Sequence, residues 1–178
     1  MLNKTIPVHI SLFFSTLALL LIPLHASQAY TSTAQTAIQL NDTQALFMID
    51  FAFGTRVNDF FIPVLAQSGI PYQSDEDVVG YDIIADRAEV ATEASSISIV
   101  LSDLEIIDGM YRIPAGSNGR FTLLTVVTVP TGIADSEYLV QVTSLPHYVG
   151  LDRDRRYVND TELRNFISPG IELNLPSQ

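Results

Sequence analysis

The sequence predicts an all-β protein: a two-sheet antiparallel sandwich of about eight strands with at most one short helix. Two observations favour this fold class. Short runs rich in Val, Ile, Phe, Tyr and Thr recur at roughly ten-residue spacing, with clusters of Gly, Pro, Asn and Asp between them. Cysteine is absent, so burial and β-ladder hydrogen bonds must stabilise the core, and paired sheets bury one face of every strand.

The first 29 residues are predicted to be a signal peptide. Lys4 supplies a short basic region, Ile10 to Leu24 is an apolar run, and Ser27 and Ala29 put small residues at the two positions that a signal peptidase inspects, so cleavage is expected after Ala29. An uncleaved membrane anchor is the alternative, but the apolar run is short for a span of about 20 residues. We therefore expect a secreted protein, extracellular, cell-surface or periplasmic, with one domain over residues 30–178 and no membrane insertion after cleavage.

The chain that remains is strongly acidic. Without Lys4 it has eight arginines, no lysine and 20 acidic residues, a net charge of −12. Phosphate backbones and anionic lipid headgroups would repel such a chain, so nucleic acid is excluded as an expected partner. The lack of cysteine likewise excludes thiolate nucleophiles, redox pairs and thiolate metal sites.

Alternating apolar residues and turn residues locate the strands of the N-terminal half. Thr33 to Leu40 alternates and is expected at a sheet edge. In the most apolar run Asp50 is discordant, and alternation puts it on the face opposite Phe47 and Phe51. Residues 66–77 are expected to form a loop and 85–94 a loop or a single helical turn. The expected strands are 33–40, 45–53, 60–64, 78–84 and 96–101.

The C-terminal half is predicted from stronger signals. Asp108-Gly109 indicates a hairpin between 104–107 and 110–113. Residues 110–144 contain three apolar runs separated by two turn-rich loops, which predicts an antiparallel β-meander. Residues 146–159 read as a polar loop. Asn159 as N-cap, with Glu162 three residues later, predicts a short helix within 159–167, and alternation predicts a last strand at 171–175.

Ten residues of this region carry a resemblance. They are Tyr111, Ile113, Gly116, Phe121, Thr122, Leu123, Pro130, Tyr138, Val140 and Val142. Their order resembles the late strands of immunoglobulin-like β-sandwich domains in prokaryotic secreted and cell-surface proteins. The resemblance implies a structural, adhesive or spacer role and brings no catalytic residues. We also expect a buried ring and a hydrogen-bonded hydroxyl at Tyr138.

Catalytic chemistry finds little support in the sequence. His147 is the only histidine after residue 29, and no nucleophile motif such as G-x-S-x-G accompanies it. Its place after Leu145-Pro146 indicates an exposed loop histidine. Paired glycosidase carboxylates stay open, since sequence gives no distances among 20 acids. No catalytic residue is therefore assigned, and an extracellular hydrolase is the last alternative.

A calcium site is the one metal hypothesis, and no other cofactor is expected. Asp152, Asp154 and Asp160 supply oxygen ligands of the kind that Ca²⁺ prefers. Their loop begins like an EF-hand, but Arg156 and Tyr157 stand where that loop needs a ligand and a glycine. The alternative is a solvated loop whose arginines and aspartates neutralise one another.

The sequence thus favours a non-enzymatic structural or adhesive protein of the cell surface, a matrix or a filament. Its predicted edge strands at 34–40 and 171–175 are candidates for pairing with protein partners or other copies. The alternative is a carbohydrate-binding or calcium-dependent adhesion module, in which some of the seven tyrosines bind glycans. Any binding site is expected in the loops at 73–77 or 152–162.

Overall fold

A computed structural model describes residues 29–86, 89–131 and 136–173. Residues 1–28 of the predicted signal peptide (1–29) lie outside these ranges, and its last residue, Ala29, is the first residue of β1. The all-β class is confirmed: fourteen strands and one short helix form the described part of the chain. The elements are β1 (Ala29–Asn41), β2 (Gln44–Gly54), β3 (Phe60–Pro63), β4 (Ala66–Ser68), β5 (Val79–Ala85), β6 (Glu89–Val90), β7 (Ser95–Leu101), β8 (Ile106–Ile107), β9 (Met110–Ile113), β10 (Asn118–Thr128), β11 (Ser136–Ser144), β12 (Pro146–Val149), β13 (Asp154–Tyr157), α1 (Asp160–Leu163) and β14 (Ile171–Leu173).

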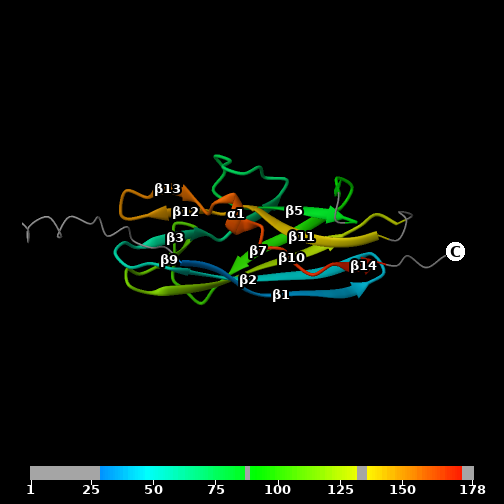
Figure 1. Cartoon of the computed structure of the whole chain (residues 1–178), viewed down its shortest axis with the longest axis horizontal. Helices are drawn as coiled ribbons and strands as arrows, with labels where there is room; N and C mark the ends of the chain where they lie inside the picture. Colours follow the sequence, from blue (N-terminus) through cyan, green and yellow to red (C-terminus); the bar gives the residue numbers. More distant parts are fainter. Residues whose placement is uncertain (1–28, 87–88, 132–135, 174–178) are drawn as a thin grey trace, which may run out of the picture.

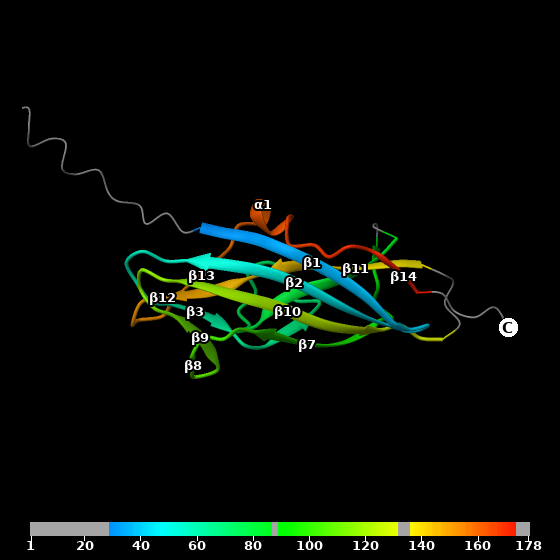
Figure 2. The same cartoon turned by 90° about the horizontal axis from the view of Figure 1, so that it is seen from below.

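The strands form three sheets where two were expected. One sheet has the order β1-β2-β10-β7, a second has β14-β11-β5-β4 with β6 beside β5, and a third has β13-β12-β3-β9-β8. All pairs are antiparallel except β4 with β5. Figures 1 and 2 show the four-stranded sheet along one side of an elongated molecule and the other two sheets end to end along the opposite side.

The opposite layer divides because the pairing partners change along one continuous stretch of chain. Only Leu145 separates β11 from β12. Strand β11 pairs with β5 and β14, whereas β12 pairs with β3 and β13. The strands before and after Leu145 have different neighbours, so this layer consists of two sheets. Alternation of apolar residues alone does not reveal the division.

Alternation in β2 and β10 builds the core side of the four-stranded sheet. Every second residue of β2 is buried, and β10 repeats this pattern in register with it. As predicted, Asp50 lies on the face away from the core, where Thr122 Oγ1 donates to its carboxylate at 2.5 Å. The inner side carries Phe51 stacked on Phe121, with ring centroids 5.3 Å apart. One main hydrophobic cluster then joins all three sheets.

Two local predictions from turn and cap chemistry are confirmed. Asp108 and Gly109 both have positive φ, 50° and 77°, and connect β8 to β9 as a tight hairpin. The side chain of Asn159 accepts a hydrogen bond from the backbone of Glu162 at 2.9 Å and caps α1. This helix has four residues, and no described helix is long and apolar enough to cross a bilayer.

The predicted meander over 110–144 is wrong, although its three runs are strands. Strand β9 belongs to the third sheet, β10 to the first and β11 to the second, so none of them pairs with another. Alternation identifies the face of a strand but not its neighbour, and each strand here pairs with a partner distant in sequence. The predicted loop at 146–159 is also wrong, because β12 and β13 form a hairpin there.

The two predicted edge strands are confirmed as edges and lie on the same side of the molecule. Strand β1 ends the four-stranded sheet and β14 ends the second sheet. Figure 2 shows β14 beside the second half of β1. The side-chain amide of Gln35 also donates to the backbone oxygen of Asn165, 3.2 Å away, between α1 and β14. This side of the molecule therefore presents the edges of both layers.

Candidate functional site

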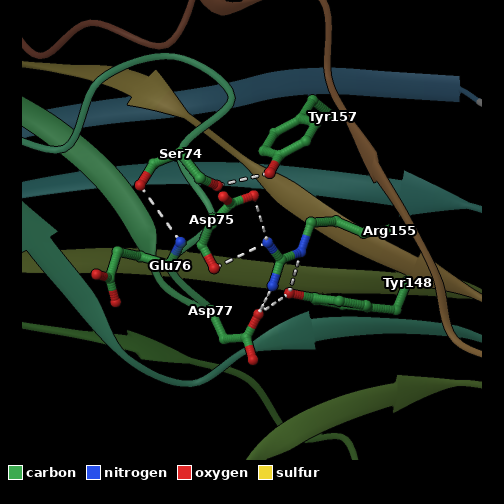
Figure 3. A network of polar contacts seen from close by, with 7 residues as sticks. All are labelled: Ser74, Asp75, Glu76, Asp77, Tyr148, Arg155 and Tyr157. Atoms are coloured by element: carbon green, nitrogen blue, oxygen red, sulfur yellow. Dashed lines mark hydrogen bonds and ion pairs between the residues drawn. The ribbon is translucent and has the colours of Figure 1, made fainter.

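A network of polar side chains joins the two loop regions that the sequence singled out. Figure 3 shows Arg155 of β13 between the 74–77 loop and Tyr148 of β12. Tyr148 and Arg155 are direct cross-strand partners in the β12–β13 hairpin, so their side chains share one face. The guanidinium carbon lies 5.5 Å from the centroid of the Tyr148 ring. The hairpin register thus places the cation beside the phenol.

Each nitrogen of Arg155 has an acceptor in this network. Nε donates to the hydroxyl of Tyr148 at 3.0 Å, and Nη1 donates to the backbone oxygen of Asp75 at 2.8 Å. Nη2 forms a hydrogen-bonded ion pair with the carboxylate of Asp77. The planar fork of a guanidinium suits such divergent acceptors, which a lysine could not serve together.

Two tyrosine hydroxyls complete the contacts. Tyr148 donates to the carboxylate of Asp77, and Tyr157 donates to the backbone oxygen of Ser74 at 2.6 Å. Burial of the ring, followed by the hydrogen bond to Asp77, raises the pKa of Tyr148 to about 12. This phenol is therefore protonated at neutral pH and acts as a hydrogen-bond donor. It has no use as a general base there.

The network holds its own members and leaves little for a substrate. The three nitrogens of Arg155 and the Tyr148 hydroxyl have partners, and the Tyr148 ring packs with Phe61 and Met110 in a small buried cluster. A catalytic site needs groups directed at a reacting atom, whereas these groups are directed at one another. The contacts instead fasten the 74–77 loop to the hairpin. Sequence reasoning named Tyr157 only as a departure from an EF-hand loop and did not single out Tyr148, although the i, i+2 spacing of Arg155 and Tyr157 was a signal that they share a face.

The three calcium candidates belong to three different local structures. Asp152 is in the turn after β12, Asp154 begins β13, and Asp160 begins α1, where it pairs with Arg164 at 3.3 Å. Among the residues that the structure describes, no three His, Asp or Glu side chains are grouped to hold a metal ion. The calcium hypothesis therefore stays a prediction without geometric support from the described residues.

The loop arginines pair outward, with acids of other loops. Arg153 Nη2 lies 2.7 Å from a carboxylate oxygen of Asp108 in the β8–β9 turn, while Arg155 reaches Asp75 and Asp77. The charges of Arg153 and Arg155 are thus neutralised by acids of other loops and not, as expected, by the aspartates of their own loop. The pair of Arg153 joins two turns of the third sheet, and the pairs of Arg155 join that sheet to the loop between β4 and β5 of the second sheet.

The expectation that His147 is an exposed loop residue is wrong. Its side chain is fully buried in β12, between the rings of Tyr30, Phe53 and Phe60. Tyr30 comes from the start of β1, so residues distant in sequence decide this burial. Burial, with a smaller effect from the charge of Arg156, lowers the pKa of His147 to about 4. The imidazole is therefore a neutral core ring at physiological pH.

Tyr138 agrees with the expectation drawn for it. The residue is buried, and burial is the main cause that raises the pKa of its phenol. A hydrogen bond with the side chain of Ser136 acts in the opposite direction. The hydroxyl is thus hydrogen-bonded while the ring fills the core.

Comparisons with protein-family models, with curated proteins and with solved structures found no match to this chain.

Proposed function

We propose that this protein is an exported, non-enzymatic structural or adhesive subunit that joins neighbouring chains by strand addition at β1. The observation that carries the proposal is the character of this edge. Strand β1 has 13 residues, AYTSTAQTAIQLN, without a charge or a proline. Side chains at positions 33–36 and 38–41 are exposed. Outside the stretch that Asn165 and β14 approach, its outer edge offers backbone groups to another strand.

The other described sheet edges are short, charged or covered. Strands β4, β8 and β14 have two or three residues, and β13 has the sequence DRRY. Strand β7 is long and uncharged, but Val100 donates to the backbone oxygen of Val64 at 2.9 Å and Ile99 forms a bridge with Leu65. Short length, charge and coverage normally protect sheet edges from pairing with other chains. Among the described edge strands, β1 is long, uncharged and free of proline.

The immunoglobulin-like class belongs to the same proposal. It is supported by two packed β-layers, by the buried rings of Tyr111, Phe121 and Tyr138, and by the turn glycine Gly116 with φ of 77°. A non-enzymatic role is supported by the Arg155 network, whose groups bind one another. Export rests on the apolar segment that ends at Leu24 and the small residues near Ala29.

The test places charge on β1 and leaves its half-buried residues unchanged, although Gln35→Lys also removes the hydrogen bond to Asn165. Gln35 and Gln39 point to the side of β1 opposite the outer sheet face and are exposed, so Gln35→Lys with Gln39→Lys adds two positive charges at the edge. Deleting the strand is less suitable, since the Tyr30 ring packs on Phe53 with centroids 4.8 Å apart. Charged edge residues oppose strand addition.

Light scattering of the full chain at increasing concentration gives the readout. We expect the parent to form assemblies larger than a monomer and the double variant to form markedly smaller ones. Thr92→Lys with Thr131→Lys is the matched control, because both positions are exposed, lie outside β1 and change the net charge equally. A parent that stays monomeric, or a double variant that assembles like the control, would contradict the proposal.

A further inference from the structure

The outer face of the four-stranded sheet carries aliphatic side chains in register across its strands. Strand pairing aligns two complete rows on this face. One row is Ile38, Leu46, Val126 and Ile97, and the next is Thr36, Met48, Leu124 and Ile99. We call these two rows, with Leu101 beside them, the aliphatic face. It is the reverse side of the sheet from the core residues Phe47, Ile49 and Leu123.

The side chains of these rows on β1 and β7 are exposed and those on β2 and β10 are half-buried, where a solvated sheet face is normally polar. Ile97 is 82% exposed, Ile38 is 44% and Leu101 is 42%. Leu65, bridged to Ile99 at the sheet margin, extends the patch with 62% exposure. A contiguous apolar patch that covers four strands marks an interaction surface rather than a chance cluster of single residues.

The distribution of charge favours a second copy of this chain as the partner of the aliphatic face. The two rows contain no charged residue, in a chain whose net charge is −11. A basic partner would need acidic groups on the surface it covers, and the rows offer none. Two copies of so acidic a chain repel each other, and the repulsion is least where the facing surfaces are free of charge. Flat aliphatic rows are also complementary to themselves.

We propose that the aliphatic face is a dimer interface that stacks on the same face of a second copy. A two-fold axis lying in the interface plane brings the face onto itself, as in an isologous dimer. The two sheets would then pack about 10 Å apart, which is the ordinary spacing of stacked sheets.

The whole outer face of this sheet, which comprises the aliphatic face and its polar margin, is large enough for a stable dimer. Strands β2 and β10 have 11 residues each. At about 3.3 Å per residue and about 4.8 Å between strands, four strands cover about 700 Å² per copy. The pair would bury about 1,400 Å², within the usual range of roughly 1,200–2,000 Å² for specific interfaces.

A polar margin borders the aliphatic rows. A groove of about 890 Å³ crosses the same sheet face beyond them, and its lining includes Asp50, Asp103 and Arg120. An apolar centre with a polar, hydrated rim is the usual anatomy of protein interfaces. In the margin row, Asp50 accepts a hydrogen bond from Thr122, so its carboxylate is stabilised next to the apolar centre.

This dimer does not depend on strand addition at β1. Strand addition lengthens a sheet within its own plane, whereas stacking joins two sheets through their faces. The two contacts use different residues, so each can be removed separately. Gln35 and Gln39 point away from the aliphatic face.

Sedimentation velocity on the full chain tests the dimer through Ile97→Glu. Because Ile97 is exposed, this variant should fold as the parent does, and circular dichroism checks its fold. Two symmetry-related carboxylates on the aliphatic face should raise the dimer dissociation constant by about 100-fold. Leu151→Glu is the matched control, because Leu151 is 96% exposed in the turn after β12, away from this face.

A second measurement uses the absence of cysteine in the chain. Val126→Cys places a single thiol near the centre of the aliphatic face, and a short bis-maleimide should link two such chains covalently. Leu151→Cys should give little of this product. A monomeric parent at tens of micromolar, or equal dimerisation of the Ile97→Glu and Leu151→Glu variants, would overturn the proposal.

The edge variants separate this dimer from the proposed function. Gln35→Lys with Gln39→Lys should leave the dimer in place while it removes larger assemblies. If these edge changes dissociate the dimer and Ile97→Glu does not, the copies associate through β1. That result refutes the stacked dimer and supports strand addition. If Ile97→Glu dissolves the dimer and edge changes never affect assembly, strand addition fails and the stacked dimer stands.

Discussion

The imidazole of His147 stacks on the ring of Phe60, with centroids 5.5 Å apart and planes inclined by 22°. Within the described residues neither ring nitrogen has a hydrogen-bond partner of normal geometry, and the backbone of Leu145 compensates only weakly. A buried imidazole without partners is stable only in its neutral form. The fold therefore contains a group that opposes protonation from inside the core.

Acid should destabilise the protein through His147. Its pKa falls from 6.5 to about 4 on folding, so the unfolded chain binds the proton more readily. The stability that depends on a neutral His147 should therefore be complete above pH 6.5. The free energy of unfolding should decrease by about 3 kcal/mol as the pH falls from there to 4. Urea unfolding of the parent and of His147→Phe at several pH values checks this. Parallel pH profiles for the two proteins would contradict it, because the carboxylates are common to both.

Loss of Arg155 should loosen the 74–77 loop more than the rest of the fold. Arg155→Met removes the hydrogen bonds to Tyr148, Asp75 and Asp77 but retains much of the apolar stem. We expect a loss of about 2 kcal/mol in the free energy of unfolding, reduced by the partial exposure of the side chain. Hydrogen exchange should be accelerated in the loop amides and in β13.

Arg155→Lys serves as the control for charge alone. One ammonium cannot reach the acceptors of all three guanidinium nitrogens, so lysine should restore only a minor part of the lost protection. Full restoration by lysine would show that charge, and not the fork geometry, fastens the loop.

The hydroxyl of Tyr111 should contribute measurably to stability. It is buried and donates to the backbone oxygen of Val100 at 3.0 Å, which links β9 to β7 across two sheets. Tyr111→Phe leaves that oxygen without this donor and should cost about 1–2 kcal/mol. Tyr72→Phe, at an exposed ring, is the control and should change the unfolding free energy by less than about 0.5 kcal/mol. Equal effects in chemical denaturation would refute the role of the buried bond.

Calcium should leave the melting temperature unchanged. Among the described residues, Asp152, Asp154 and Asp160 belong to no group of three or more acids that could hold a metal ion, and Asp160 already pairs with Arg164. A ligand that binds only the folded state raises the melting temperature in proportion to its affinity. Calorimetric scans with millimolar Ca²⁺, with Mg²⁺ and with EDTA should coincide. A rise specific to Ca²⁺ would support the calcium hypothesis in a geometry not seen here.

Local sequence signals predicted local structure well. Alternation located β2, β7 and β10, the Asp108-Gly109 pair predicted its hairpin, and Asn159 predicted the helix cap. In each case the deciding interactions lie within a few residues along the chain. Side-chain period and backbone φ preferences are sufficient there.

Long-range choices escaped prediction. The three strands of 110–144 entered different sheets because their partners, β2, β3 and β5, come from other parts of the chain. His147 was misjudged for the same reason, since Tyr30 from β1 covers it. The Arg155 network also required the 74–77 loop to fold over the hairpin, which no local pattern indicates.

The position of β2 between β1 and β10 affects the order in which this sheet can form. The first two strands can pair as soon as Gly54 is available, but the third strand of that sheet ends at Thr128. Closing so long a loop costs entropy before the contacts form, and folds rich in distant pairings acquire structure slowly. A chain that is synthesised residue by residue therefore cannot complete this sheet until residue 128 is available, so much of its core forms late in synthesis.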